Sequence, residues 1–465
     1  MRLIVLTFDR LPARLLACYG NEWMETPAFD QLAARSTVFE QHFAELPGEA
    51  GPAHPWWTGQ LEYFDSGARE SAADVTTVAS LVASGVKCRL ITERIEGLPL
   101  DEFSSWEQIA VKDSFDMDHA ESPIARLVQR ALEIGGTPLE PGKKEVLWLH
   151  SRGVPSPWIP PRVFADLYLT ELEGDDEEEE WDEHTGATIV PETPLDASDA
   201  EPDPHRDFDP TGILDELAEN PALADSILSE TVSPDAPEAE PQDESDELER
   251  LVSRYIFAGY VSLLDHWLGR LVRGLEETTG GTPSGNEAAK TLLVVTAASG
   301  HVVGDRRAFI ENKSELSELC DELLQTPLVI HEVGSTEFGT RNLSLAGPQD
   351  LAATLTDLLG IETPEPLSGN SLAAPSGERI SLLHLSPSGE VAYRDREWLL
   401  VLPDTSLLQR DLLDDEDELQ FAAQLYALPD DLWQVNDVSS RRGDVVFDLA
   451  AKLQSALQAA GRLRT

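Results

Sequence analysis

LIVLTFDR, residues 3–10, begins with six uncharged residues in a row, and only then come Asp9 and Arg10. A short apolar run of this kind is typical of a strand that is buried on both faces of a sheet. Similar runs recur along the chain, separated by longer stretches whose apolar residues lie three or four positions apart. This alternation predicts an α/β fold with a large, mostly parallel central sheet flanked by helices. The further runs are CRLIT at 88–92, VLWLH at 146–150, TLLVVT at 291–296 and PLVI at 327–330.

Helix signals fall between the predicted strands. Pro27 stands where a proline favours the start of a helix, and Gly85 and Gly360 stand where a glycine ends one. From residue 390 onward, shorter strands and a last amphipathic helix predict a smaller C-terminal α+β subdomain. The helices are predicted over residues 26–35, 76–84, 248–278, 350–359 and 445–457.

The composition limits the classes of protein to consider. The chain has 465 residues, 41% of them hydrophobic, which is enough for a real core in one large or two modest domains. A net charge of -52 argues against binding to nucleic acid or to an anionic membrane, because both reward clusters of Lys and Arg, while cationic partners remain open. Three widely spaced cysteines without a CxxC motif predict neither a disulfide scaffold nor a thiolate zinc site. Because no signal peptide or transmembrane segment is recognised, we expect a soluble cytoplasmic protein.

Residues 171–250 differ sharply from the rest of the chain. They hold 30 Asp and Glu against two Arg, with prolines scattered throughout. Such a segment buries too little apolar surface to offset its ordering entropy, so a largely disordered acidic insertion is expected, and a basic protein surface is a candidate partner. Within it, residues 212–228 have near-helical apolar spacing, which leaves a docking helix and a flexible spacer both open. The predicted organisation is 1–170 and 251–375 for the α/β core, 171–250 for the insertion and 376–465 for the C-terminal subdomain.

Several blocks, taken together, resemble one family. The most specific is ACYGNEWMETPAFDQLAARSTVFEQHF at 17–43, and Thr58-Gly59 follows at the expected distance. TLLVVTAASGHVVGD at 291–305, QDLAATLTDLLGIETPEPLSGNSL at 349–372 and LYALPDDLWQVNDV at 425–438 continue the series in the same order. These landmarks resemble the sulfatase family of the alkaline-phosphatase-like superfamily, over nearly all of the chain except the acidic insertion.

The resemblance implies metal-dependent hydrolysis of sulfate esters. In that family, two Asp at the end of the first strand, with an Asp and an Asn or His after a later strand, hold a divalent cation, usually calcium. The nucleophile comes from a Cys/Ser-x-Pro-x-Arg segment, and Lys and His residues stabilise charge and protonate the leaving oxygen.

This sequence departs from the family pattern at the chemistry. The paired aspartates of the first strand align with Asp9 and Arg10, so Asp9 is the one retained metal-ligand position and is expected to be vestigial. The later ligand pair aligns with Ala298 and Ser299, and the nucleophile position falls on Glu49. The other family positions without a functional counterpart are Ala53 for the Arg, Gly153–Pro157 for the His, Glu93 for one Lys and a position near Leu316 for another.

The sequence therefore predicts no catalytic residue and no cofactor, and a non-catalytic protein that acts by binding. The alternative is an active hydrolase of sulfuric or phosphoric esters with a remodelled metal site. Two carboxylates and two imidazoles near the strand ends suit zinc or manganese, although each has an ordinary structural interpretation. That candidate set is Asp9, Glu49, His54 and His301.

Three further features have weaker functional readings. Ser151 follows His150, but no GxSxG elbow surrounds it, so a hydrolase triad is poorly supported. Trp56 and Trp57 line a binding cleft or, more commonly for such pairs, pack in the core. Cys18 is expected to be an inert buried thiol.

Overall fold

In the computed structural model the chain forms two compact units, which are described separately. The first unit comprises Met1–Lys112, Ala120–Pro155 and Leu264–Thr465, and the second comprises Asp113–His119 and Ser156–Leu263. The residues that the structure describes are 1–51, 54–61, 76–169, 180–181, 188–189, 210–220, 224, 227–228, 244–280, 290–302, 317–362, 369–373, 379–408 and 416–459.

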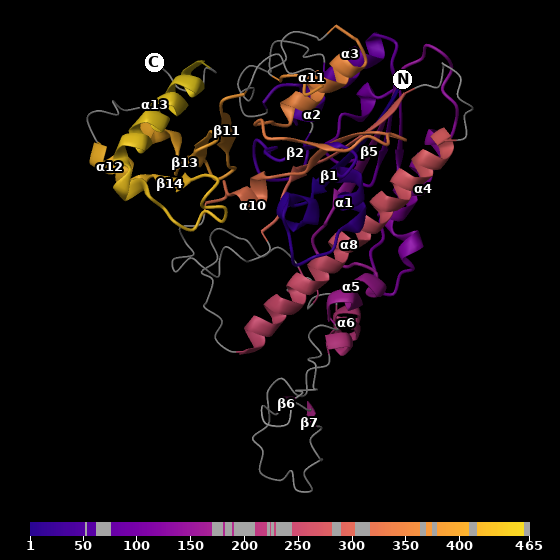
Figure 1. The fold of residues 1–465 in the computed structure, drawn as a ribbon, viewed down its shortest axis with the longest axis horizontal. Helices are drawn as coiled ribbons and strands as arrows, with labels where there is room; N and C mark the ends of the chain where they lie inside the picture. The colour runs from indigo at the N-terminus through magenta and orange to yellow at the C-terminus, as the bar shows by residue number, and fades with distance from the viewer. Residues whose placement is uncertain are drawn as a thin grey trace. The chain divides into compact units, whose positions relative to one another are not determined.

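Within the described residues, the first unit is built on an eight-stranded sheet of order β10-β2-β9-β8-β1-β5-β3-β4 (Figure 1). β1 lies between β5 and β8 and is parallel to both, with Thr7 opposite His150 and Thr296. β9 runs antiparallel to both of its neighbours. The prediction of a large, mostly parallel sheet is confirmed. The strands are β1 Arg2–Arg10, β2 Thr37–Phe39, β3 Lys87–Thr92, β4 Ser105–Gln108, β5 Glu145–Gly153, β8 Thr291–Ser299, β9 Leu328–Glu332 and β10 Thr340–Asn342.

The central strands are the apolar runs of the sequence. All of β8, and all of β1 except Arg10, are buried. The paired tryptophans Trp56 and Trp57 are fully buried in the cluster that joins this sheet to its helices, which confirms their role in packing. The helices of this cluster are α2 Pro55–Thr58, α3 Thr77–Ala83 and α11 Gln349–Leu358.

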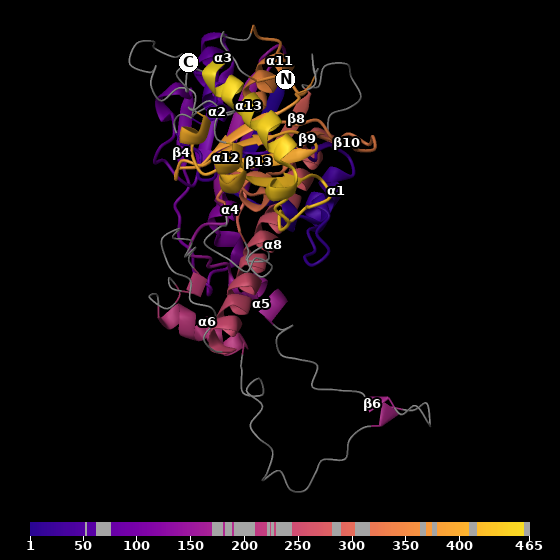
Figure 2. The same ribbon diagram turned by 90° about the vertical axis from the view of Figure 1, so that its left-hand side faces the viewer.

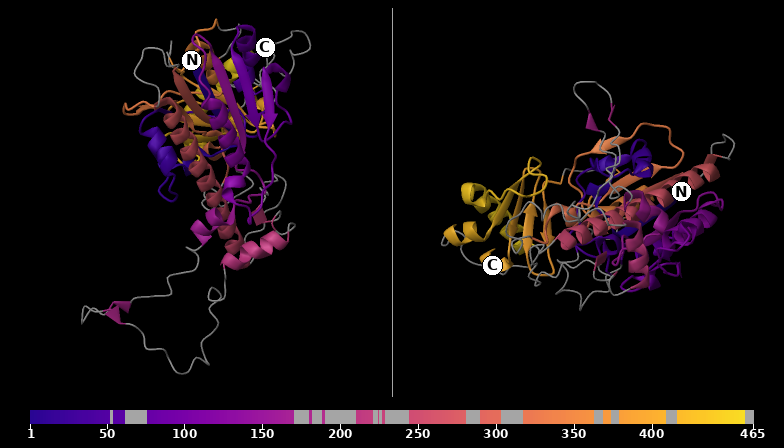
Figure 3. Two further views of the ribbon diagram at one scale, coloured as in Figure 1. Left: turned by 90° about the vertical axis from the view of Figure 1, so that its right-hand side faces the viewer. Right: turned by 90° about the horizontal axis from the view of Figure 1, so that it is seen from below.

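Two further helices flank the sheet, of which the first was not predicted and the second confirms the helix predicted over residues 248–278. α4, Pro123–Gly135, contacts β3 and β5. α8, Glu244–Gly280, is the longest described helix, and its colour locates it in Figure 3. A Cβ at Gly274 of α8 would lie within 3 Å of the Leu132 side chain of α4, so glycine permits the close approach of the two helices.

α1, Pro27–Ala33, starts at the proline that the sequence singled out. The preceding residue Thr26 makes no side-chain capping bond. Instead the carboxylate of Asp265, on α8, accepts the backbone N–H groups of Ala28 and Phe29 at 2.9–3.1 Å. A residue more than 200 positions away therefore satisfies the donors at this helix start.

The C-terminal part of the first unit holds an antiparallel sheet of order β11-β12-β13-β14. It confirms the predicted C-terminal subdomain of short strands and a last helix, of which β13, α12 and α13 are labelled in Figure 2. The last helix, α13, packs on β12 and β13 over a continuous apolar cluster. A second cluster, which includes Phe43 and Tyr426, joins this sheet to the residues after β2. The elements are β11 Leu382–Leu385, β12 Val391–Arg394, β13 Trp398–Leu402, β14 Gln424–Ala427, α12 Glu416–Ala422 and α13 Gly443–Ala459.

The second unit contains α5, Arg162–Leu169, and α6, Pro210–Glu219, which contact each other. Leu214 and Leu217 of α6 are buried, so the helical alternative for residues 212–228 holds over the range of α6. Most of the acidic insertion lies outside the described residues, and its predicted disorder stays a prediction. Two short strands, β6 Glu180–Trp181 and β7 Thr188–Ile189, pair within it.

In the described ranges, none of the helices combines the length and the apolar character needed to cross a lipid bilayer.

Candidate functional site

The candidate site lies at the carboxyl ends of β1, β3 and β5, the edge at which open α/β sheets bind ligands. Asp9 stands at the end of β1, and His150 stands near the end of β5. Arg94 follows β3 by two residues. Because the three strands are parallel neighbours, their ends meet and these three side chains come together.

The guanidinium of Arg94 grips the carboxylate of Asp9 with two hydrogen bonds. Arg94 Nη2 lies 2.8 Å from Asp9 Oδ1, and Arg94 Nε lies 3.0 Å from Asp9 Oδ2. The same Nη2 donates to the carbonyl oxygen of Ala50 at 3.0 Å, and Nη1 donates to that of Glu96. The backbone N–H of Ala50 in turn donates to Asp9 Oδ1 at 3.1 Å. Two parallel charge-assisted bonds form the strongest class of protein hydrogen bond, so this arrangement fixes both side chains.

The Asp9 carboxylate is buried and is held ionised. Asp9 is 1% exposed to solvent, and the side chain of Arg94 is 14% exposed. Burial by itself would raise the pKa of Asp9, but His150 and Arg94 together hold that pKa well below its usual range. His150 Nε2 lies 3.3 Å from Asp9 Oδ1, and its Nδ1 lies 3.0 Å from Thr7 Oγ1. Asp9 is thus enclosed by a guanidinium, an imidazole and a backbone N–H.

The nucleophile position of the family carries a carboxylate in this chain. The Glu49 side chain is 54% exposed, and its Oε2 lies 3.7 Å from Arg94 Nε. Arg94 therefore lies between two carboxylates, one buried and one exposed. Ala53, aligned with the family Arg, lies outside the described residues.

The residues at the end of β8 are hydrogen-bonded to the backbone of Leu323. Ala298 is buried and has no side-chain donor atom for a metal, and Ser299 Oγ donates to the carbonyl oxygen of Leu323 at 3.2 Å. The backbone N–H of Gly300 donates to the same oxygen at 2.7 Å. A Cβ at Gly300 would overlap the carbonyl oxygen of Glu322, so a larger residue would be excluded here. This strand end thus supplies no carboxylate to the site.

The residues present do not fit a divalent cation. Across the described ranges, the His, Cys, Asp and Glu side chains form no group of three or more that has the arrangement of a metal site. At an effective dielectric near 20, each unit charge at 4 Å contributes about 4 kcal/mol, so the repulsion of Arg94 cancels the attraction of Asp9 for a nearby cation. Asp9 remains the one residue at a family ligand position, and its vestigial role stays a prediction.

The proposed zinc or manganese set does not assemble as a metal-holding group. His54 accepts the backbone N–H of Trp56 on Nδ1 at 3.3 Å, and burial lowers the pKa of His54 to about 3. Its imidazole is consequently neutral and caps the N-terminus of α2. His301 is buried at 2% exposure.

The remaining candidates have structural partners. Ser151 Oγ donates to Glu93 Oε2 at 3.0 Å and accepts the backbone N–H of Gly153 at 3.1 Å, so the bond that it donates goes to a carboxylate and not to a histidine. Glu93, aligned with a family Lys, also accepts the backbone N–H of Arg152 at 3.0 Å. Cys18 is buried, and burial raises the pKa of its thiol to about 12, as expected of an inert cysteine. Leu316 lies outside the described residues.

Sequence reasoning missed Arg94 and the contact of His150 with Asp9. The prediction placed the cation of the site at Arg10, the residue beside Asp9. The signal that identifies both lies in the strand pattern, because each residue lies near the carboxyl end of a predicted parallel strand. Charged residues at such ends deserve to be considered together even when they are far apart in sequence.

The fold is shared with known hydrolases. No protein-family description matches the chain, and no curated protein does. Among solved structures, the phosphonate monoester hydrolase of Agrobacterium radiobacter superposes with a TM-score of 0.63 at 16% identity, covering 99% of this chain and 96% of its own. The phosphonate monoester hydrolase SpPMH from Silicibacter pomeroyi gives 0.63 at 18% identity, covering 100% and 95%. BT1596, a 2-O GAG sulfatase, gives 0.58 at 14% identity, covering 99% and 92%. The chain therefore has the fold that these sulfatases and phosphonate monoester hydrolases share.

Proposed function

We propose that this chain is a non-catalytic protein on a sulfatase fold, which acts by binding and not by hydrolysing esters. The observation that carries the proposal is the bidentate salt bridge in which Arg94 donates two hydrogen bonds to the carboxylate of Asp9. In the family that the sequence resembles, that carboxylate holds a metal ion. Here its two oxygens already bind a cation that belongs to the protein.

The contact with Arg94 is costly to displace. A metal ion at Asp9 would have to break two charge-assisted bonds and leave the guanidinium without its carboxylate in a mostly buried place. The ion would gain one buried carboxylate in return, since Ala298 offers no ligand and Glu49 is largely exposed. The balance favours the guanidinium over the ion.

The nucleophile argument points the same way and is independent of the metal. Residues 46–60 hold no Ser, Cys, Lys or Arg. Thr58, the hydroxyl-bearing residue of this loop, donates to the carbonyl oxygens of His54 and Gln60. Thr58 belongs to the Thr-Gly landmark of the family and stands nine residues after Glu49, the residue at the nucleophile position.

The test combines metal binding with ester turnover. Full-length protein is titrated calorimetrically with calcium, manganese and zinc, and is assayed on aryl sulfate and aryl phosphate with each metal. We expect no saturable heat that depends on Asp9 and no turnover above the buffer rate. Metal-dependent turnover that the Asp9→Ala variant abolishes would instead establish the active hydrolase with a remodelled site.

For the partner, the acidic insertion supports a basic protein surface. Residues 171–250 carry a net charge of -28 of the chain's -52. Opposite charge at this density steers association and makes it sensitive to salt. Polylysine is a suitable probe: its binding should weaken steeply with added salt and should fall when residues 174–209 are deleted. Unchanged binding by the deleted chain would show that another surface is responsible.

A further inference from the structure

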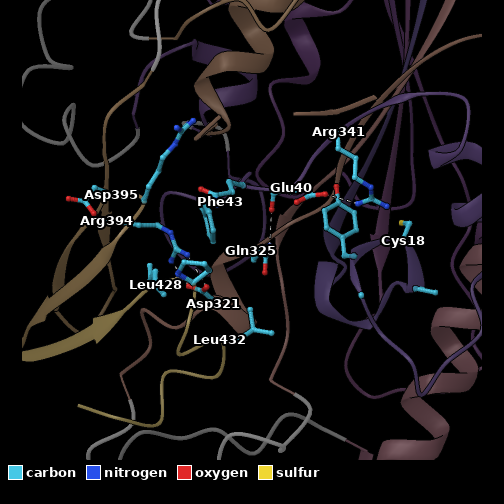
Figure 4. Close-up of a pocket in the computed structure, with 16 residues that line it drawn as sticks. Cys18, Glu40, Phe43, Asp321, Gln325, Arg341, Arg394, Asp395, Leu428 and Leu432 are labelled. Atoms are coloured by element: carbon cyan, nitrogen blue, oxygen red, sulfur yellow. Dashed lines mark hydrogen bonds and ion pairs between the residues drawn. The ribbon is translucent and has the colours of Figure 1, made fainter. Parts of the chain in front are cut away.

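A cavity of about 460 Å³ lies in the first unit, between the residues that follow β2 and the C-terminal sheet. This volume is within the range of small-molecule sites in proteins. Figure 4 shows Arg341 and Glu40 on one side of it and Arg394 and Asp395 on the other, with Phe43, Gln325 and Asp321 between them. Asp9, Arg94 and His150 do not line it, so the cavity is separate from the candidate site described above.

One wall of the cavity is backed by a buried group of charges. The carboxylate of Asp321 accepts hydrogen bonds from both terminal nitrogens of Arg394. Its Oδ2 also accepts one from Arg14 Nη2 at 2.9 Å. The side chains of these three residues are 5–9% exposed. Two guanidinium groups on one carboxylate leave one positive charge in excess within this group, while Glu40 and Asp395 are further carboxylates that line the cavity.

The group is rigid. Gln434, with a left-handed φ of 54°, donates through Nε2 to Asp321 Oδ1 at 2.6 Å and accepts the backbone N–H of Asp321 at 3.1 Å. The guanidinium of Arg394 lies 3.6 Å from the ring centre of Phe43. Burial opposes ionisation of Asp321, yet Arg394 and Arg14 lower its pKa to about 2. Asp321 therefore stays ionised over the whole physiological pH range, and the group formed with Arg14 and Arg394 keeps a single positive charge.

The guanidinium of Arg341 lies on the opposite side of the cavity, and part of the cavity lining is apolar. Arg341 Nη1 donates to Glu40 Oε1 at 2.9 Å, and half of the Arg341 side chain is exposed. Leu428 and Leu432 line the same cavity, and Leu432 is 51% exposed. A site with a planar cation and an apolar edge suits a molecule that carries one oxyanion beside an apolar body.

We propose that this cavity binds a small organic anion, a carboxylate, sulfate or phosphate monoester with an apolar group, between Arg341 and the Arg394 wall. The overall charge of -52 does not prevent this, because at physiological ionic strength charges farther than about 8 Å are largely screened. The proposal is independent of whether the Asp9 site hydrolyses esters.

The experiment uses benzoate, phenyl sulfate and phenyl phosphate as anionic probes, with phenol as the uncharged analogue, in calorimetric titrations of the full-length protein. At least one anion should bind with an affinity of roughly millimolar or better, and phenol should bind at least about tenfold more weakly. The three anions distinguish the headgroup that fits. No binding of any anion, or equal binding of phenol, would overturn the proposal.

Variants then locate the site. Arg341→Gln should weaken anion binding about tenfold or more, the scale of one charged hydrogen bond. Leu432→Glu should weaken it more than the matched Leu432→Gln variant does, because both changes remove apolar contact and only the glutamate adds a repelling charge at the rim. Arg130→Gln, at an exposed pair on α4, is the control and should bind as the wild type does.

Asp9→Asn separates this proposal from the proposed function. The variant should retain anion binding, since Asp9 does not line the cavity. Loss of binding in Asp9→Asn, or full binding in Arg341→Gln, would place the anion elsewhere and overturn the assignment. Turnover at the Asp9 site would defeat the non-catalytic proposal and leave this one standing.

Discussion

Replacing Arg94 by Met tests the resident cation most directly. The change keeps much of the side-chain length but leaves the buried carboxylate of Asp9 without its guanidinium. Breaking one partner of a buried ion pair costs about 3–5 kcal/mol, because the remaining charge stays buried and uncompensated. We expect the free energy of unfolding to fall by an amount in this range.

A double-mutant cycle separates the pair from its surroundings. Asp9→Asn alone should also destabilise the protein, because Arg94 then keeps its charge at 14% exposure without its buried carboxylate, and the exposed Glu49 at 3.7 Å compensates it less. Asp9→Asn combined with Arg94→Met removes both charges, so its cost should be smaller than the sum of the two single changes by about 2 kcal/mol or more. Arg130→Met, at an exposed pair, is the matched control and should cost less than about 1 kcal/mol.

Urea unfolding followed by tryptophan fluorescence is the assay. Urea is uncharged and does not compete with Arg94 for the carboxylate, as guanidinium would. Trp56, Trp57 and Trp148 are buried in the core cluster next to the site and report its unfolding. Single changes that add to within about 0.5 kcal/mol in the double variant would mean that the two side chains are not coupled, and the reasoning would fail.

Acidification gives the same pair a second signature. The pKa of Asp9 is lowered in the folded protein, so its contribution to stability is present above the unfolded value near 3.8 and is lost as the pH falls below it. In Arg94→Met that pKa is depressed less, so the variant should lose less stability than the wild type on this acid limb. An equal loss in both proteins would show that Arg94 does not hold the carboxylate ionised.

Two further predictions concern the rest of the fold. Burial raises the pKa of Asp265 to about 6, so the folded protein binds this proton more tightly than the unfolded chain does. The bound proton therefore stabilises the folded state below about pH 3.8, and this contribution of about 3 kcal/mol is lost as the pH rises through 6. Unfolding measured as a function of pH should detect this change in the wild type but not in Asp265→Asn. Deleting residues 174–209 should leave the melting temperature within a few degrees of the wild-type value. Deleting residues 174–241 also removes the buried Leu214 and Leu217 of α6, so it should lower the melting temperature clearly. Equal melting temperatures for the two deletions would contradict the packing of α6.

Much of the fold followed from local pattern. Strands buried on both faces are mostly apolar, and the central residues of β1 and β8 show this pattern in the sequence. The start of α1 was visible in Pro27, but the partner of its first N–H groups was not. Asp265 caps that helix from more than 200 residues away, and nothing local to either residue indicates the contact.

For the candidate site, too, the sequence shows which residue types are present, and the tertiary structure shows which of them meet. That the aligned positions hold Glu49 and Ala298 is a property of the sequence, and folding cannot create a nucleophile or a ligand that the chain lacks. The cation at Asp9 was predicted one residue away, at Arg10, because adjacency is all that a sequence displays. The register of three parallel strands brings Arg94 to Asp9 across 85 positions.

The sequence by itself determined the central strands, several of the main helices and which chemical groups are missing, because hydrophobic periodicity and residue identity are local properties. Only the tertiary structure decided which charge neutralises Asp9 and which arginines share Asp321. Coulomb and hydrogen-bond energies depend on distances between atoms, and those distances are set when strands and loops far apart in the chain are brought to one edge of the sheet.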